Sequence, residues 1–499
     1  MDLRNVYMGK ILRVDLNEGS CEEEELTEEM VENHIGGAAL GIELYKQHAD
    51  REPVVIGTGP LTGTFAPSSS GGFVTARSPV TGRVCHVPLM GQTAVELKYS
   101  GFDFVVILGE AAKPVRLWLH DELAEVADAG PIWGLDVWKT TDWLRHEHGD
   151  DYVQVLSIGP AGEARSPLAQ FSENHWGSRD IFGLGAALGA RKLKAVAMRG
   201  MGSLDVADGF FEACRKTQVE IRKGRIYGRK GLLPLLEALG AKAQELEPLQ
   251  RQAHRSLALF NSPYAACTYL MIEEPAELLK ESKKDEPGLL LTDPAGVLSL
   301  LALGDGLPAV LRRINRLGLD PVACGNLLRK ENLTGAADAE KRLQEIAATV
   351  SGLEAAGVAN VYGAAPWPLT NAPEERLVQA LAVFSHALPP RPVGGGYDDF
   401  SVSGDPVARA SWWVERMAAC SILGLCPLSA LLSPVFSMEE TAGWCRDAAG
   451  WEGFTAEKLR AKCRDLVRET VALGGPKGTV PADWVTPGWE EDLKKLSTA

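Results

Sequence analysis

Two short segments of this chain place hydrogen-bonding side chains and a thiol at matching positions around a Gly-Leu pair. Residues 315–320 read Asn-Arg-Leu-Gly-Leu-Asp, and residues 421–426 read Ser-Ile-Leu-Gly-Leu-Cys. Glycine readily adopts the left-handed backbone angles with which many helices end, so each Gly-Leu pair predicts a turn at the end of a helix. The polar residues flanking the two turns are candidates for contact with a polar ligand: Asn315, Asp320, Ser421 and Cys426.

Three further groups of residues could carry chemistry, and each also has a structural explanation. The spacing of Gly183–Gly189, G-x-G-x-x-x-G without a preceding strand, favours a helix packed through small residues over a nucleotide-binding turn. His146 and His148 could ligate zinc, but on a helix they point to different faces, which favours structural or surface roles. Residues 68–72, Ser-Ser-Ser-Gly-Gly, could cradle an anion or form an ordinary hairpin loop, and the sequence leaves both open.

Composition restricts the class of protein. The 499 residues are 45% hydrophobic and 23% charged, as in soluble globular proteins, and the net charge is −15. So acidic a chain lacks the basic surface that nucleic-acid binding needs. No apolar run approaches the roughly 20 residues of a membrane span, and residues 1–13 lack the pattern of a secretory signal, so we expect a cytoplasmic protein without a membrane span. The nine cysteines form no C-x-x-C pair and predict reduced, mostly buried thiols.

Apolar periodicity divides the chain near residue 205. Before it, short apolar runs bounded by Gly, Pro and Ser predict strands at 10–16, 54–57, 72–76, 104–109, 115–119 and 153–158, with helices at 93–99 and 137–148. After it, helical spacing predicts helices at 209–222, 232–246, 294–317, 336–356, 406–423, 437–448 and 455–473. The Pro- and Gly-rich stretch 364–396 is the candidate boundary. We expect an α+β protein with a β-rich domain at 1–205 and helical domains at 206–365 and 366–499.

Several motifs of the first 200 residues jointly resemble the aldehyde ferredoxin oxidoreductase family of tungsten enzymes. They are Ile35–Gly37, Gly59–Thr64, Ser78–Gly82, Glu96–Lys98, Ser157–Glu163 and Gly185–Ala195. The resemblance implies an N-terminal domain of two β-sheets that forms a base for two pterins bridged by tungsten, two mostly helical domains that cover the cofactor, and a [4Fe-4S] cluster beside it. It also implies which positions bind the cofactors: Gly185, Asn315, Gly318, Leu319, Asp320, Ser421, Gly424 and Leu425 for the pterins and Cys426 for the cluster.

The resemblance also identifies departures from the family at the cluster. A four-iron cluster needs four thiolates, and the family supplies three of them from a Cys-x-x-Cys-x-x-x-Cys segment. The matching positions here are Leu259, Ser262 and Ala266. Cys426 is the only cysteine in place, and Cys267 lies one residue beyond the third position. We therefore expect that the cluster is lost and that Cys426 carries no metal.

The pterin-binding positions depart from the family as well. Ala38 and Gly71 stand where the family places arginines against the phosphates, and residues 88–91 read Pro-Leu-Met-Gly where the family has Asn-Ser-Gly-Gly. An arginine–phosphate contact is bidentate and charge-assisted, so its loss weakens anion binding substantially. Asn315 and Ser421 replace the aspartates with which the family's two loops begin. We expect that tungstopterin is lost too, and that the chain binds no cofactor.

The positions that serve acid–base catalysis in the family have also changed in this chain. Gly288 stands where the spacing would place a glutamate, and His386, the histidine in the corresponding region, lacks the expected neighbours. The first hypothesis is therefore a non-catalytic structural or partner subunit, in a homo- or hetero-oligomer with an active paralogue or a ferredoxin-like subunit. The alternative is an active tungsten- or molybdenum-pterin aldehyde oxidoreductase that depends on a partner for electron transfer. A third possibility is a protein whose emptied cavity binds another small molecule.

Overall fold

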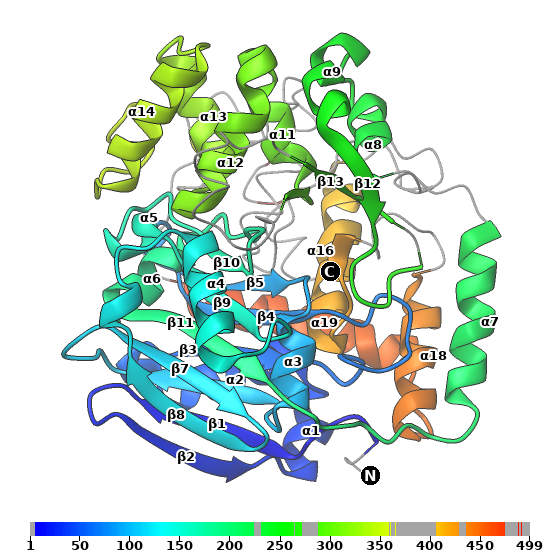
Figure 1. The fold of residues 1–499 in the computed structure, drawn as a ribbon. Coiled ribbons are helices and arrows are strands. Elements are labelled where there is room, and N and C mark those ends of the chain that lie inside the picture. Colours follow the sequence, from blue (N-terminus) through cyan, green and yellow to red (C-terminus); the bar gives the residue numbers. More distant parts are fainter. Residues whose placement is uncertain are drawn as a thin grey trace.

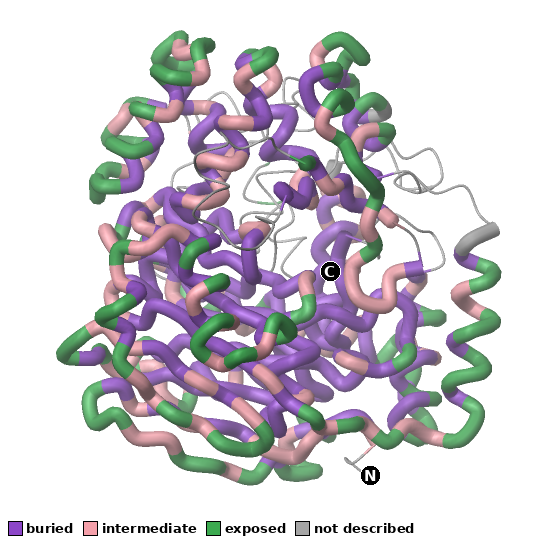
Figure 2. The backbone as a smooth tube through the Cα atoms, in the orientation of Figure 1, coloured by how far each residue is buried: buried purple, intermediate pink, exposed green. Residues whose placement is uncertain are grey.

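The computed structural model describes residues 5–223, 231–263, 265–271, 288–358, 360, 365, 406–428, 436–474, 488 and 491. Two β-sheets from the first 200 residues lie in the lower part of Figure 1, and helices of the second half lie above and to the right of them. Most of the main chain in and around the sheets is buried (Figure 2). The expected class, an N-terminal two-sheet β-rich region followed by helical segments, is confirmed.

The larger sheet has six strands in the spatial order β2-β1-β6-β3-β4-β5. β1 and β6 are parallel, and the other neighbours are antiparallel. β3 and β6 are buried at every position, whereas the edge strand β2 carries the four glutamates 22–25, three of which pair with Lys10 and Arg13 of β1. The strands are β1 (Lys10–Asp15), β2 (Ser20–Glu25), β3 (Val54–Thr58), β4 (Gly72–Arg77), β5 (Val84–Leu89) and β6 (Phe104–Leu108).

The smaller sheet has five strands in the order β10-β9-β11-β7-β8, with β7 and β11 parallel. Its strands are β7 (Val115–His120), β8 (Leu123–Asp128), β9 (Gln154–Ile158), β10 (Phe171–Glu173) and β11 (Leu193–Arg199). The segments that link and flank the strands are α1 (Glu28–His34), η2 (Ala49–Arg51), η3 (Gly130–Ile132), α4 (Val137–His148) and α5 (Pro160–Glu163). One apolar cluster contains side chains of both sheets, so the two sheets share a core.

Two short helices, α3 (Thr93–Tyr99) and α6 (Leu184–Ala190), contact strands of both sheets. α6 reads Leu-Gly-Ala-Ala-Leu-Gly-Ala, and its glycines allow very close packing. A Cβ atom on Gly185 would clash with the main chain of Gln170, and one on Gly189 would clash with the carbonyl oxygen of Gly162. The expectation of a helix packed through small residues is therefore confirmed.

Helices from the end of the chain return to cover the larger sheet. α2 (Gly37–Gln47) packs against β3 and β4, and both α16 (Pro406–Leu423) and α19 (Ala456–Ala472) pack against α2. In Figure 1 these two late helices, orange and red, lie next to the blue N-terminal elements. α18 (Met438–Ala449) contacts α19 and also α7 (Phe210–Lys223), which lies at the edge of the molecule. The C-terminal helices are thus part of the core of the N-terminal half.

The middle of the chain forms the upper layer in Figure 1. A three-stranded antiparallel sheet, in the order β12-β13-β14, lies between its helices and the rest of the molecule. The elements of this upper layer are α8 (Leu233–Ala238), α9 (Ala243–Gln252), β12 (Ala253–Leu257), β13 (Cys267–Leu270), β14 (Leu289–Leu291), α11 (Pro294–Leu300), η4 (Leu301–Gly306), α12 (Leu307–Leu317), α13 (Pro321–Lys330) and α14 (Ala336–Ala347).

All six expected strands are present, as are the helices expected at 93–99, 137–148, 209–222, 406–423, 437–448 and 455–473. Three helix predictions are wrong in extent. The expected helix 294–317 is interrupted at Gly304, whose φ of 51° is not helical, and 232–246 is two helices separated at Gly240 (φ 98°). Helix 336–356 ends at Ala347. The candidate boundary 364–396 lies almost wholly outside the described residues, and the division into three domains stays a prediction.

One stretch of the described residues has the length and composition of a membrane span. It runs from Pro294 to Leu317; an 18-residue window within it has a mean hydropathy of 1.5, and 67% of that window is buried inside the protein. The apolar character is that of a core segment, because buried leucines of α11 and α12 pack against their neighbours in the upper layer.

The close packing of α6 leads to a test of stability. Gly189→Ala should lower the free energy of unfolding by about 1–3 kcal/mol, because the added methyl group would overlap the Gly162 carbonyl. Gly443→Ala in α18 is the matched control: its methyl group would meet only Arg446 at 3.8 Å, so the change should be neutral or stabilising by up to about 1 kcal/mol. Urea unfolding followed by circular dichroism measures both, and equal stability of the two variants would contradict the packing argument.

Candidate cofactor site at the two Gly-Leu turns

Both Gly-Leu pairs form the helix-ending turns expected from the sequence. α12 ends at Leu317, and Gly318 follows in the left-handed conformation with φ 70°. α16 ends at Leu423, and Gly424 follows with φ 81°. In both turns the glycine N–H bonds to a carbonyl near the end of its helix, that of Asn315 in the first and that of Cys420 in the second. The structure thus gives Gly318 and Gly424 a backbone role.

The second turn lies directly on the main chain of the N-terminal half. The Leu61 N–H donates to the Leu423 carbonyl at 2.8 Å, and the Gly71 N–H donates to the Gly424 carbonyl at 3.0 Å. The approach is so close that a Cβ atom on Gly37, Gly59 or Gly71 would overlap main-chain atoms of residues 421–425. Main chain therefore meets main chain where these segments approach the second turn.

Ser68 connects the two segments that the family uses for its cluster. Its carbonyl accepts the Cys426 N–H at 2.7 Å, and its own N–H donates to the Asn261 carbonyl at 2.9 Å. Ser68 is fully buried and adopts the left-handed conformation, φ 62°, which is uncommon for a residue with a side chain. Its hydroxyl has no hydrogen-bond partner among the described residues.

These contacts decide between the two interpretations of residues 68–72. The segment is buried throughout, so it is not an exposed hairpin loop. Two of its backbone N–H groups, those of Ser68 and Gly71, are bonded to other carbonyls, and the Ser69 and Ser70 hydroxyls donate to the carbonyls of Thr64 and Met90. The segment is a connecting strap between three parts of the chain, and these N–H groups are not available to an anion.

The segment that matches the family's cysteines is held by hydrogen bonds. Asn261, in the left-handed conformation with φ 50°, donates from Nδ2 to the Ala66 carbonyl at 2.6 Å. Leu259 packs against the large apolar core. Cys267 pairs with Leu257 in the β12–β13 ladder and is fully buried, and burial raises the pKa of its thiol to about 12, with a smaller contribution from Cys426.

The residues present do not fit a [4Fe-4S] cluster. Such a cluster binds thiolates, and the side chains of Leu259 and Ala266 have no donor atom. Cys267 lies one residue beyond the third position, and its backbone is committed to a strand. Across the described parts of the chain, no group of three or more His, Cys, Asp or Glu side chains is arranged to hold a metal ion.

The first turn uses its polar side chains to hold the fold. Asn315 accepts from Trp138 Nε1 through Oδ1 at 2.5 Å, and the Arg316 guanidinium lies 4.5 Å from the centre of the Trp138 ring. Asp320 caps α13 by accepting the Val322 N–H at 3.0 Å. The Gln170 N–H donates to the Gly318 carbonyl at 2.8 Å, and Leu319 bridges to the same segment. The turn is thereby fixed to α4 and to the strand segment before β10.

The backbone of Gly185 is hydrogen-bonded to a buried carboxylate, that of Asp180. Asp180 accepts the Gly185 N–H at 3.0 Å and the Phe182 N–H at 2.9 Å. Burial raises the pKa of Asp180 from 3.8 to about 7, and the negative charge of Asp320 adds to the rise, whereas the backbone N–H groups oppose it. The Gly185 N–H is therefore used inside the protein.

Glu173 holds the segment 88–91 that replaces the family's polar motif. Its carboxylate accepts from the Met90 N–H at 2.7 Å and the Gly91 N–H at 3.1 Å, and Thr93 Oγ1 donates to it as well. Glu173 is almost fully buried, and burial raises the pKa of its carboxyl group. No sequence motif marks this residue, because its partners, two backbone N–H groups and the Thr93 hydroxyl, lie far away in the chain.

The remaining candidates have structural surroundings. The His148 ring stacks on Trp118 with a centroid distance of 3.7 Å, and His86 lies between the hydroxyls of Thr75 and Thr470 at 2.6 and 2.8 Å. Gly288 accepts from Trp176 Nε1 through its carbonyl at 3.3 Å. His386 lies outside the described residues.

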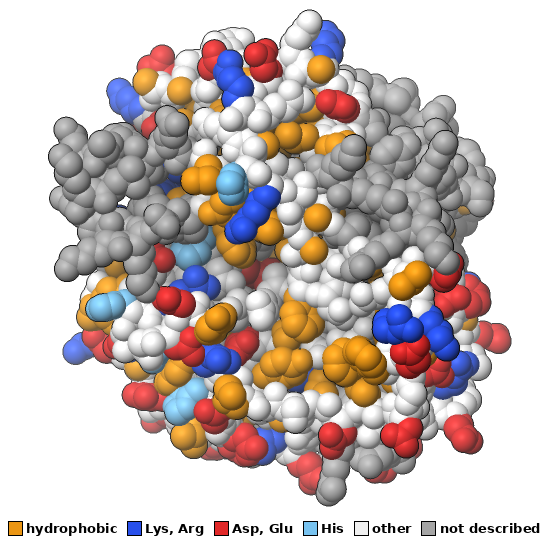
Figure 3. Space-filling model, turned by 45° about the vertical axis from the view of Figure 1, so that its right-hand side comes forward, with side chains coloured by type: hydrophobic (Ala, Val, Ile, Leu, Met, Phe, Trp, Pro, Cys, Tyr) orange, Lys and Arg blue, Asp and Glu red, His pale blue; other side chains and the backbone are white. Residues whose placement is uncertain are grey.

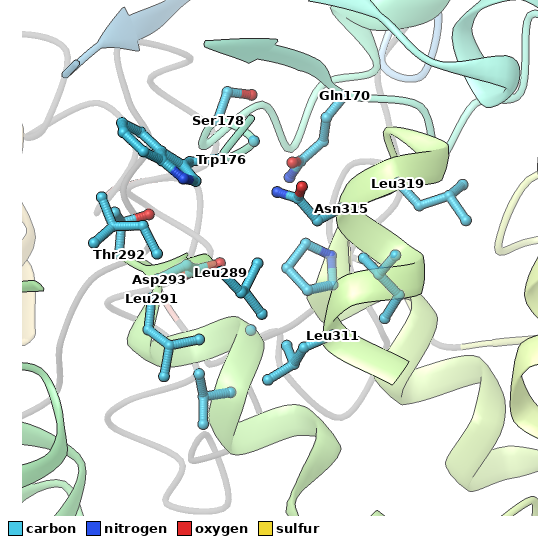
Figure 4. Close-up of a pocket in the computed structure, with 16 residues that line it drawn as sticks. Gln170, Trp176, Ser178, Leu289, Leu291, Thr292, Asp293, Leu311, Asn315 and Leu319 are labelled. Carbon is cyan, nitrogen blue, oxygen red and sulfur yellow. The ribbon is translucent and has the colours of Figure 1, made fainter. Parts of the chain in front are cut away.

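A pocket of about 60 Å³ opens beside the first turn (Figure 4). Its floor is apolar, and three polar side chains, Gln170, Ser178 and Asn315, line its other side. The floor comes from β14, α11 and α12: Leu289, Leu291, Val297, Leu311 and Ile314.

Comparison with known proteins agrees with the resemblance carried by the motifs of the first 200 residues. The model of the N-terminal domain of aldehyde ferredoxin oxidoreductase matches residues 11–200. Residues 11–200 of the chain are thus similar to the N-terminal domain of that family. A tungsten-containing aldehyde ferredoxin oxidoreductase of Pyrococcus abyssi is 37% identical over 232 residues, which are 44% of this chain but only 38% of that protein. The aliphatic sulfonate oxidoreductase, WOR-like subunit, of Pyrococcus furiosus is 30% identical over 223 residues, 40% of this chain and 35% of that protein.

A solved structure extends the similarity of fold over almost the whole chain. It is the active site complex BamBC of benzoyl coenzyme A reductase in complex with 1,5-dienoyl-CoA. The match covers 98% of this chain and 93% of the other, with a TM-score of 0.75 and 19% sequence identity. At so low an identity, the match supports a shared fold and nothing about function. The described helices of the second half therefore share the fold of that structure.

Asn261 provides a test of the hydrogen-bonded strap. Asn261→Gly keeps the left-handed conformation but removes the side-chain bond to Ala66, so the free energy of unfolding should fall by about 1–3 kcal/mol. Asn332→Gly is the control, because Asn332 is exposed and has nearly the same φ, 55°; its effect should stay within about 0.5 kcal/mol. A similar loss in both variants, measured by urea unfolding, would show that Asn261 does not fix the strap.

Asp180 provides a test by pH. Because its pKa in the folded protein is about 7 and its ordinary value is 3.8, the folded state binds the proton more tightly than the unfolded state. The stability that this group contributes is complete at low pH and is lost as the pH rises through 7. Asp180→Asn should remove that part of the pH dependence, about 1.4 kcal/mol per unit of pKa shift, whereas exposed Asp338→Asn should preserve it. Parallel curves for Asp180→Asn and the unmodified protein would contradict the assignment.

Proposed function

We propose that this chain is a non-catalytic structural or partner subunit of an oxidoreductase complex and that it has lost the [4Fe-4S] cluster. The observation that carries the proposal is the strap around Ser68. Where the family joins two segments through iron, this chain joins Asn261 and Cys426 through the Ser68 backbone. Hydrogen bonds and apolar packing link the two segments in place of the cluster. The chain has no complete set of ligands for the iron–sulfur cluster that would carry electrons.

The loss of tungstopterin forms part of the same proposal. Gly37, Gly59 and Gly71 lie against the second turn without a gap, and the polar side chains of the first turn bond within the protein. Positions from each of the family's phosphate, cluster and acid–base sets are altered, and one cause, relaxed selection on the whole site, accounts for these changes together. The preserved glycines then serve the turn geometry alone.

Assembly with other subunits is the remaining part of the proposal. One relative is described as a WOR-like subunit, and the structure with the same fold is a complex of two named components, BamB and BamC. We infer that this chain likewise belongs to a homo- or hetero-oligomer, with an active paralogue or a ferredoxin-like protein as the partner. Cytoplasmic residence stays a prediction.

Anaerobic purification tests the proposal. The full chain, expressed with tungstate, molybdate and iron in the medium, should contain no stoichiometric tungsten, molybdenum or iron by elemental analysis and should show no absorption band in the visible range. Stoichiometric tungsten or molybdenum with bound pterin would instead establish the alternative, an active pterin oxidoreductase.

Reconstitution with iron and sulfide distinguishes two explanations for a missing cluster: the chain lacks the cysteine ligands, or its fold leaves no room for a cluster. The unmodified chain should take up no stable cluster, because three of the four ligand positions are not cysteine. The triple variant Leu259→Cys, Ser262→Cys, Ala266→Cys is the matched comparison, with Cys426→Ser in the same background as its control. Four tightly bound irons in the unmodified chain would refute the proposed loss of the cluster.

A further inference from the structure

The segment that connects β11 to α7 has a row of main-chain groups that the fold does not use. The segment is fixed at both ends: the Gly202 N–H donates to the Tyr99 carbonyl at 2.9 Å, and the Ala207 N–H donates to the Ala448 carbonyl of α18 at 3.1 Å. Between these two bonds, residues 203–206 form no hydrogen bond with any described part of the chain. These four residues, here called the edge segment, therefore have main-chain donors and acceptors available on a backbone that is held at both ends.

The edge segment has the form of a β-strand. Residues 201–207 run without a turn or a bend. The side chains alternate in burial, because Ser203 and Asp205 are exposed whereas Leu204 and Val206 are half-buried. Val206 packs against the large apolar core. A period of two in burial is that of a strand with one face on the protein, so the segment resembles the edge strand of a sheet to which no neighbour has been added.

A pocket of about 410 Å³ lies beside the edge segment. Its wall includes Leu204 and Val206 of the segment and three aromatic residues, Phe65, Tyr99 and Phe260. Ligand pockets in proteins typically have volumes of roughly 300–1,000 Å³, so this pocket is large enough to receive a large apolar side chain. Available main-chain groups and an apolar pocket thus lie next to each other.

Exposed apolar side chains extend this pocket onto the surface. Phe65 is 48% exposed and Phe211 is 54% exposed, and their rings meet edge to face with centroids 4.8 Å apart. Met201, just before the edge segment, is 79% exposed. Figure 3, which turns the side with α7 forward, shows hydrophobic side chains gathered in the lower middle of this face. Large apolar side chains gathered beside a pocket are typical of a surface that binds a partner.

Charge selects among the possible occupants of this surface. Asp205 and Asp208 are exposed and form no ion pair with a described residue, and no lysine or arginine is among the described residues that line the pocket. On the adjoining helix α7, Arg215 already pairs with Glu212. A second copy of this chain, paired through the same segment about a two-fold axis, would bring the aspartates of both copies together, and like charges across a strand pair are destabilising. A partner segment with lysine or arginine gains attraction instead.

We propose that the edge segment pairs with an extended, basic segment of a partner protein, which adds a β-strand here and places a large apolar side chain in the pocket. Main-chain hydrogen bonds supply affinity, the pocket selects the side chain, and the two aspartates select lysine or arginine beside it. The inference concerns the chemistry of the partner's segment, and it holds whether or not this chain is catalytic.

Three fluorescein-labelled peptides test the proposal with the full-length protein, and fluorescence anisotropy measures their binding. The first is Lys-Thr-Trp-Thr-Lys with blocked ends, the second has glutamate in place of both lysines, and the third is the first peptide with methyl groups on all its backbone nitrogens. We expect the first to bind once per chain, the second to bind at least about tenfold more weakly, and the third not to bind. Absence of saturable binding of the first peptide, or equal binding of the second or third, would overturn the proposal.

A matched pair of charge reversals assigns the binding to the edge segment. Asp205→Lys changes an exposed side chain, so the variant should fold normally and should bind the glutamate peptide more tightly than the lysine peptide. Asp50→Lys is the control, because Asp50 is also exposed but precedes β3 and does not line the pocket; it should keep the original preference. The same preference in both variants would show that net charge, and not this site, determines binding, and would refute the assignment.

The aromatic wall of the pocket gives a second variant with a different readout. Phe65→Ala removes a half-exposed ring, so both the lysine and the glutamate peptide should bind about tenfold more weakly while the ratio of their affinities stays the same. Undiminished binding by this variant would place the tryptophan of the peptide outside the pocket and contradict the proposal.

Discussion

Direct contact between main chains at the second Gly-Leu turn is the constraint on which the molecule depends. Side chains normally keep two backbones apart, and here Gly37, Gly59 and Gly71 remove that spacing. The contact fixes the end of α16, and α16 in turn packs on α2 together with α19. Because α2 lies on β3 and β4, the order of layers from the sheet to the C-terminal helices follows from this one approach. A larger residue at any of the three glycines would separate the layers.

Buried polar groups complete the same region from within. The Lys98 ammonium donates to the Gly59 carbonyl and to the Val6 carbonyl, each at 2.7 Å, beside Asp103, which accepts three backbone N–H groups. Burial lowers the pKa of Lys98 to about 8 and raises that of Asp103 to about 6. Together with Glu173 and Asp180, these groups pair buried backbone N–H and carbonyl groups of the surrounding loops, which would otherwise be left without partners.

Much of the framework was predictable from the sequence, and the reasons are local. The apolar runs that became β3 and β6 are bounded by turn residues, and α6 is recognisable from its glycines and alanines alone. The break at Gly304 was not predictable, because a single glycine within a long apolar run is compatible with a continuous helix. β12 and β13 were missed for another reason: β12 is mostly exposed and polar, so its pairing partner defines it. The Trp138–Asn315 bond and the role of Gln170 arise only when distant segments meet.

The strap around Ser68 has a consequence for how the chain acquires its structure. Its carbonyl and N–H bind partners in the middle and near the end of the chain, so the loop beneath the sheets cannot be completed until nearly all of the polypeptide is present. Contacts between residues so far apart in sequence slow folding, because a long loop must close before the contact is gained. During synthesis the β-rich half would emerge while the loop around Ser68, which is buried in the folded protein, is still exposed to water. Completion of the packing around residue 68 therefore waits for the synthesis of residues 261 and 426.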